Sequence, residues 1–117
     1  MDDNINKYIN QGILYDFYGK LLTAHQQKIY EDLAFNDLSL SEIAQNEGIS
    51  RQGVSDLIKR CDKALFAYEE KLGLIKKFER TRSYIKEIQN IIKTYQETKD
   101  DELISKIEKL SYEILDL

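Results

Sequence analysis

Apolar residues recur at intervals of three and four positions along most of the chain, which is the spacing of one side of an α-helix. Every fourth position from Ile5 to Phe17 is apolar, and this predicts a first helix over residues 5–18. Thr23 is a favoured N-cap residue type and predicts a second helix over about 24–34. The N-terminal third of the chain is therefore expected to be helical.

The segment 38–60 predicts a short helix that is followed by a tight turn and a second helix. Ser39 can accept a hydrogen bond from the backbone of Glu42 while the Glu42 carboxylate returns the bond, which is a capping box. Gly48 can adopt the left-handed conformation that ends a helix. Ala44 is small, as a close crossing of two helices requires. These features predict the first half of a helix-turn-helix.

A longer helix is expected after this turn. Ile49 is expected to point back to the core, and Ser50 is a second N-cap. Apolar residues then keep a spacing of three or four as far as Leu72, and Gly73 is expected to end the helix. The pattern therefore predicts a helix-turn-helix over about 39–63.

The remaining residues, 74–117, predict two helices with a break at 97–101. Both carry apolar residues in the heptad pattern of helices that pack together. The apolar seams are more extensive than two helices hide from each other, so they either pack on the first unit or pair between chains. Because helix-turn-helix proteins commonly read two half-sites, a homodimer is the favoured alternative. The expected dimer interface consists of Phe78, Ile85, Ile88, Ile92, Leu103, Ile107, Leu110 and Ile114.

The composition excludes several other classes of protein. The 117 residues include no proline and one valine, so an all-β domain lacks its turn and β-branched residues. One His and one Cys allow neither a Cys/His zinc site nor a disulfide framework, and leave no catalytic triad. No apolar run has the length of a membrane span, and the acidic N-terminus does not resemble a signal peptide. We therefore expect a cytoplasmic, non-enzymatic, all-α protein without a metal or cofactor.

The predicted organisation is a helical unit over residues 1–72, which contains the helix-turn-helix, and a helical extension over 74–117. The chain has 17 basic and 21 acidic residues, a net charge of −4. Nucleic-acid binding depends on neutralising phosphates, and no basic tail is present to do so. Any nucleic-acid interface must therefore be local.

The helix-turn-helix segment resembles region four of bacterial sigma factors and the related output domains of response regulators. In that fold the second helix of the motif enters the DNA major groove. The resemblance implies an all-α, sigma-factor region-four-like bundle with a C-terminal two-helix extension. It also implies that DNA would be contacted by Arg51, Gln52, Ser55, Asp56, Lys59, Arg60 and Lys63.

These residue types suit different parts of DNA. Arg51 could pair with guanine and Gln52 with adenine, whereas Lys59 could meet a phosphate. Asp56 is discordant, because a carboxylate repels phosphate. Four basic residues of this helix stand against two acidic residues, Asp56 and Asp62. The resulting excess of two positive charges is small for a tight DNA binder. A protein or RNA partner therefore stays open as an alternative to DNA.

The resemblance extends beyond the motif to residues 14–23, 38–44, 50–60 and 68–72, which are similar to the YlxM family of small bacterial proteins. Members of this family lie next to genes of the signal recognition particle. The resemblance therefore implies either a DNA-binding protein or a component of that pathway. The leading hypothesis is regulatory DNA binding, and the alternative is a non-enzymatic adaptor that binds a protein or RNA component of the signal recognition particle.

Overall fold

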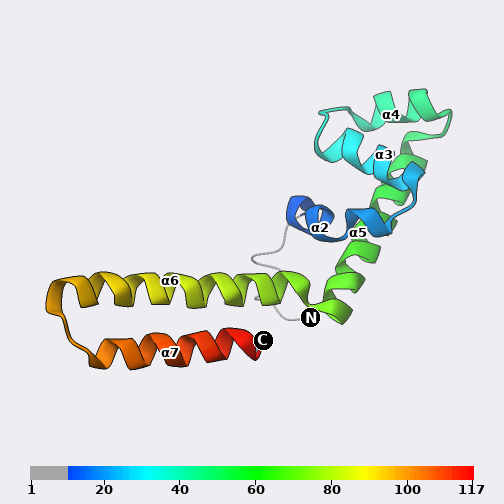
Figure 1. The fold of residues 1–117 in the computed structure, drawn as a ribbon. Coiled ribbons are helices and arrows are strands. Elements are labelled where there is room, and N and C mark those ends of the chain that lie inside the picture. The colour runs from blue at the N-terminus through cyan, green and yellow to red at the C-terminus, as the bar shows by residue number, and fades with distance from the viewer. Residues whose placement is uncertain (1–10) are drawn as a thin grey trace. The chain divides into compact units, whose positions relative to one another are not determined.

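The computed structural model describes residues 11–117, and all regular secondary structure within that range is helical (Figure 1). The expectation of an all-α fold is confirmed. The N-terminal part of the first predicted helix, with Ile5, Tyr8 and Ile9, lies outside the described residues. The elements are α2 (Gln11–Tyr18), a 3-10 turn η1 (Gly19–Leu21), α3 (Ala24–Ala34), α4 (Leu40–Glu47), α5 (Arg51–Leu72), α6 (Leu74–Thr98) and α7 (Glu102–Leu115).

The chain divides into two compact units. Unit 1 ends at Ile75, and unit 2 comprises Lys76–Leu117. The structural boundary therefore lies just inside α6, two residues after the Gly73 at which the sequence predicts a division. Unit 1 holds α2 to α5, and unit 2 consists of most of α6 together with α7.

Side-chain caps fix the starts of the helices in unit 1. The Ser39 hydroxyl accepts from the Glu42 backbone N–H at 3.0 Å, and Glu42 Oε1 accepts from the Ser39 N–H at 3.2 Å. This confirms the predicted capping box. Thr23 caps α3 in the same way, and it also forms a box, with Gln26, which the sequence analysis did not identify. Ser50 accepts from the third backbone N–H of α5 at 2.9 Å.

Two glycines end helices in the left-handed conformation. Gly48 ends α4 with φ 68°, and Gly73 ends α5 with φ 62°. A side chain at either position would be strained, because L-residues other than glycine rarely adopt such angles. The predicted helix ends at Gly48 and Gly73 are therefore confirmed, and the left-handed conformation of each glycine explains why the helix stops there.

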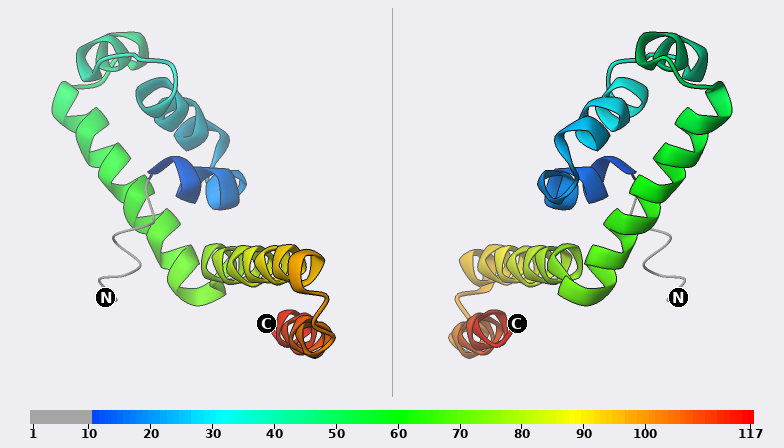
Figure 2. Two further views of the ribbon diagram at one scale, coloured as in Figure 1. Left: turned by 90° about the vertical axis from the view of Figure 1, so that its left-hand side faces the viewer. Right: turned by 90° about the vertical axis from the view of Figure 1, so that its right-hand side faces the viewer.

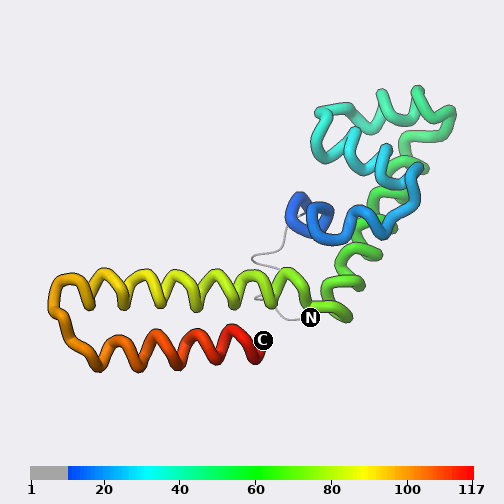
Figure 3. Tube along the Cα trace, in the orientation of Figure 1, coloured from blue at the N-terminus to red at the C-terminus, as the bar shows by residue number. Residues whose placement is uncertain are grey.

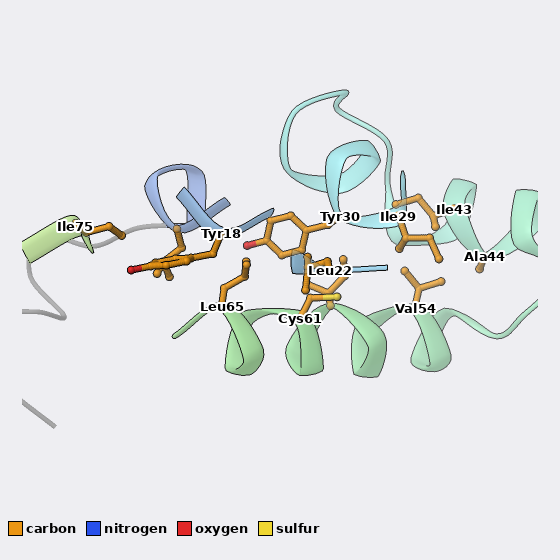
Figure 4. Close-up of a cluster of buried hydrophobic side chains, with 12 residues drawn as sticks. Tyr18, Leu22, Ile29, Tyr30, Ile43, Ala44, Val54, Cys61, Leu65 and Ile75 are labelled. Carbon is orange, nitrogen blue, oxygen red and sulfur yellow. The ribbon is translucent and has the colours of Figure 1, made fainter. Parts of the chain in front are cut away.

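The core of unit 1 forms around one side of α5. Val54, Cys61 and Leu65 are fully buried, and they lie against Tyr30 of α3 and Ile43 of α4 (Figure 4). This burial is the main stabilising contribution of the apolar stripe. Cys61 is a small core residue, since it has no exposed surface and burial raises the pKa of its thiol.

One expectation about the apolar positions is wrong. Ile49 does not point into the core, because its side chain is 42% exposed at the head of α5. In α2, Ile13 and Phe17 of the predicted stripe are half-buried and pack against the core, and the neighbouring Leu14 and Tyr18 are buried. This short helix is therefore enclosed on more than one side.

Unit 2 is a helical hairpin in which α6 and α7 run antiparallel beside each other (Figures 2 and 3). Lys99 has φ 57°, and Asp100 Oδ1 accepts from the Glu102 N–H at 3.0 Å, which turns the chain into α7. The positions with reduced exposure follow a heptad pattern on both helices. They are Thr81, Tyr84, Ile88, Ile91 and Tyr95 of α6, and Leu103, Ile107, Leu110, Ile114 and Leu117 at the C-terminal end of the chain.

Candidate nucleic-acid interface

The predicted helix-turn-helix is formed by α4, a three-residue turn and α5. The Ile49 N–H donates to the Ala44 carbonyl at 3.1 Å, which closes the turn behind Gly48. Ala44 and Ile43 of α4 are buried, and so is Val54 one turn into α5. The small side chain of Ala44 lets the two helices approach closely, so α5 is held firmly by the core at its N-terminal end.

One side of α5 is buried in the core, and the other side is exposed to solvent. The buried residues Val54, Ile58, Cys61 and Leu65 recur at spacings of four and three. The candidate contact residues occupy the remaining side, because successive residues of a helix are separated by about 100°. Of the candidates, Ser55 is half-buried, and the exposed ones are Arg51, Gln52, Asp56, Lys59, Arg60 and Lys63.

Asp62 belongs to the interior side and not to the exposed side of α5. Its Oδ1 accepts from the Tyr30 hydroxyl at 2.6 Å, and both carboxylate oxygens accept from the Gln11 side-chain amide at 2.9–3.0 Å. Burial, followed by the hydrogen bond to Asp62, raises the pKa of Tyr30 above its usual range. Asp62 therefore ties α5 to α2 and α3.

The hydrogen bonds of Asp62 do not remove it from the charge of the candidate interface. Asp62 is half-buried, and its partners Tyr30 and Gln11 are uncharged, so it still counts with Asp56 against Arg51, Lys59, Arg60 and Lys63. The local positive excess of two is therefore unchanged, although Asp56 is the acidic residue that stands among the exposed side chains.

Gln52 and Asp56 form a pair on the exposed side. Gln52 Nε2 donates to Asp56 Oδ1 at 2.9 Å, one helical turn apart. Bidentate pairing of Gln52 with adenine uses both the amide nitrogen and the amide oxygen. The amide nitrogen carries two N–H groups, so one can donate to adenine while the other stays bonded to Asp56, and the pair then orients the Gln52 side chain.

The C-terminal end of α4 contacts α3 through Glu47. Glu47 Oε2 is 3.1 Å from His25 Nε2, and Glu47 Oε1 is 3.5 Å from Lys28 Nζ. The hydrogen bond from His25 is the main cause that lowers the pKa of the Glu47 carboxyl. Both basic side chains are exposed, so each contact is a weak surface interaction. His25 is therefore an exposed residue of α3 that makes a weak contact with the end of α4.

Residues 11–117 hold no group of three or more His, Cys, Asp and Glu side chains that could bind a metal ion. No helix within this described part combines the length and the apolar character needed to cross a membrane.

The family model described as "Putative helix-turn-helix protein, YlxM / p13 like", named UPF0122, matches residues 5–109. The chain belongs to the UPF0122 family. The match covers both units, including the helix-turn-helix and most of the hairpin of unit 2. The resemblance to YlxM proteins is thereby confirmed, and the helix-turn-helix is a property of the family and not a chance arrangement in one sequence.

Several bacterial UPF0122 proteins are similar to this chain. That of Thermoanaerobacter sp. (strain X514) is 41% identical and aligns with 100% of this chain and 98% of its own length. That of Caldanaerobacter subterraneus subsp. tengcongensis is 50% identical over 68% of each chain. That of Desulforamulus reducens is 38% identical over 89% of each. In the first of these relatives the similarity runs through the residues of both units of this chain.

Proposed function

We propose that this UPF0122 protein is a cytoplasmic regulatory protein that binds duplex DNA, with α5 lying in the major groove. The observation that carries the proposal is the composition of the exposed side of α5. Arg51, Lys59, Arg60 and Lys63 lie on it with a single acidic residue among them, and none of the four is buried in the core. A helix held by the core on one side and basic on the other has the shape and charge that groove binding requires.

The position along α5 suggests a role for each residue. Arg51 and Gln52 are in the first turn, where helix-turn-helix proteins contact base edges, so they are the proposed base-reading residues. Lys59, Arg60 and Lys63 lie two or more turns further along and are the proposed phosphate contacts. The modest positive excess indicates a weak complex that is observed most readily at low salt.

Alanine substitution of Lys59 tests this proposal. Lys59→Ala is expected to weaken binding to all duplex sequences about equally and to lower the salt slope of the affinity by about one unit, because one phosphate contact is lost. The measurement is fluorescence anisotropy of labelled duplex DNA, titrated with protein at several salt concentrations beginning near 50 mM.

Lys71→Ala is the matched control. Lys71 is an exposed lysine in the last turn of the same helix, remote from the proposed interface, and its removal should leave the salt slope unchanged. If both variants behave alike, the binding is not centred on the N-terminal half of α5. If the parent ignores duplex DNA at low salt but Lys59→Ala abolishes binding to signal recognition particle RNA or protein, the helix-turn-helix is an adaptor surface and the DNA proposal is wrong.

A further inference from the structure

Unit 2 exposes large apolar side chains that its own hairpin does not cover. Ile85 and Ile92 of α6 are 44% and 41% exposed, and Ile104 and Leu115 of α7 are 50% and 80% exposed. Phe78 is also 45% exposed, with Arg82 lying over its ring. Contiguous apolar surface of this kind is uncommon on a chain that acts alone, and it marks an interaction site.

These residues lie on the same face of the hairpin. On α6, Ile85 and Ile92 each follow a half-buried seam residue by one turn, and on α7 Ile104 comes one position after the half-buried Leu103. By helical geometry both sets are therefore turned to the same side of the hairpin, because α6 and α7 run antiparallel and, seen from one end, residues advance in opposite rotational senses along them. Leu115 lies with Ile104 on that side of α7.

The positions of the apolar residues along the hairpin also match in pairs. The chain turns between Thr98 and Glu102, so residues equally far from the turn lie at the same level. Ile85 is then level with Leu115, and Ile92 is within about one turn of Ile104. A second, identical hairpin placed on this face would bring residues at the same distance from the turn next to each other. It would cover the side chains of Ile85, Ile92, Ile104 and Leu115.

The charges beside this apolar face are complementary between the two helices. Helix α6 carries six basic and three acidic residues, whereas residues 99–117 carry three basic and six acidic ones. On α6, Lys86 and Lys93 each follow an apolar residue of this face by one position, and on α7 Glu108 follows Ile104 by one helical turn. Two basic helices would repel each other, so charge favours the packing of α6 against α7 of another hairpin.

We propose that a second copy of this chain covers this face, so that two α6–α7 hairpins form an antiparallel four-helix bundle in which each α6 lies against the partner's α7. The interface consists of Ile85 and Ile92 from one copy against Ile104 and Leu115 from the other, with Lys93 beside Glu108 at its edge. Among the residues predicted for the dimer interface, Phe78, Ile85 and Ile92 are exposed and belong to this face. In the proposed bundle the less exposed residues lie between the two helices of one hairpin, and they are Ile88, Leu103, Ile107, Leu110 and Ile114.

Sedimentation velocity of the full chain tests the proposal without DNA, so its outcome is independent of the DNA proposal. At tens of micromolar the parent is expected to sediment at twice the 13.8 kDa chain mass. Ile92→Glu should convert it to a monomer while the helical content stays the same, because a charge on this face cannot be paired in the bundle. A parent that sediments as a monomer would overturn the proposal.

Ser83→Glu is the control for a charge added elsewhere on the hairpin. Ser83 is exposed and precedes Ile85 by two positions, which places it about 200° around α6 from Ile85, so this variant is expected to remain dimeric. A dimer that is lost in Ser83→Glu and retained in Ile92→Glu would show that the interface lies on another face of the hairpin.

A charge exchange tests the orientation of the two hairpins. Lys93→Glu and Glu108→Lys alone should each raise the Kd of dimerisation about tenfold, since the two-fold symmetry creates the like-charge contact twice. The double variant restores the pair and should return the Kd to within about threefold of the parent. Additive weakening in the double variant would contradict packing of α6 against the partner's α7.

Discussion

Glu69→Ala is expected to lower the free energy of unfolding by about 3 kcal/mol, because two buried donors lose their acceptor. Glu69 is 3% exposed, and its Oε1 accepts from the Tyr18 hydroxyl at 2.5 Å and from the Ile75 N–H at 2.9 Å. The Tyr18 hydroxyl accepts in turn from the Leu74 N–H at 3.1 Å. Together the two side chains cap the first turn of α6, which follows directly on Gly73.

The physical environment of this pair supports a large effect. Burial and the hydrogen bond to Glu69 raise the pKa of Tyr18 to about 12, so its hydroxyl stays protonated as a donor at neutral pH. Urea unfolding followed by circular dichroism measures the change, and Glu70→Ala is the control. Glu70 is the exposed neighbour, and its loss should cost less than about 0.5 kcal/mol. Equal costs for the two variants would show that the Glu69 cap does not stabilise unit 1.

Ala44→Leu is expected to destabilise the fold by about 1–3 kcal/mol, because it overpacks the crossing of α4 and α5. Ala44 is buried, and its carbonyl accepts the hydrogen bond from Ile49 that closes the turn. The added side chain would either separate the helices or shift α4, and both changes would move the N-terminal turn of α5. The same urea experiment measures the loss.

Gln45→Leu provides the comparison for Ala44→Leu. Gln45 is the next residue of α4 and is exposed, so a leucine there has no helix to displace. Its stability should stay within about 0.5 kcal/mol of the parent. A tolerated leucine at position 44 would mean that the two helices do not pack as closely as the helix-turn-helix requires.

Most of the fold could be predicted because its signals are local. The Ser39–Glu42 box, the two left-handed glycines and the Ser50 cap are each set within a few residues of sequence, and all of them are confirmed. The heptad pattern of the last 44 residues likewise indicated two helices with a break between them, and both are present. Caps and left-handed helix ends depend on the residue types at a few neighbouring positions, so the helix boundaries could be predicted from these residues.

The rest depended on contacts between residues that are distant in sequence. Nothing near Asp62 reveals that Tyr30 and Gln11 hold its carboxylate, 32 and 51 positions away. The same is true of Tyr18 and Glu69, which are separated by 51 positions. Sequence spacing could therefore not show which side chains hold Asp62 and Glu69, and it placed Ile49 in a core that its side chain does not enter.

Residue-resolved NMR of the full chain with duplex DNA is the most direct test of the central claim, that α5 binds DNA through its exposed side. At low salt the account predicts that the largest changes in amide chemical shift fall within 50–63, with Arg51 and Gln52 among them, and that residues 76–117 change little. Shifts that are confined to unit 2, or their absence at saturating duplex DNA under low salt, would contradict it.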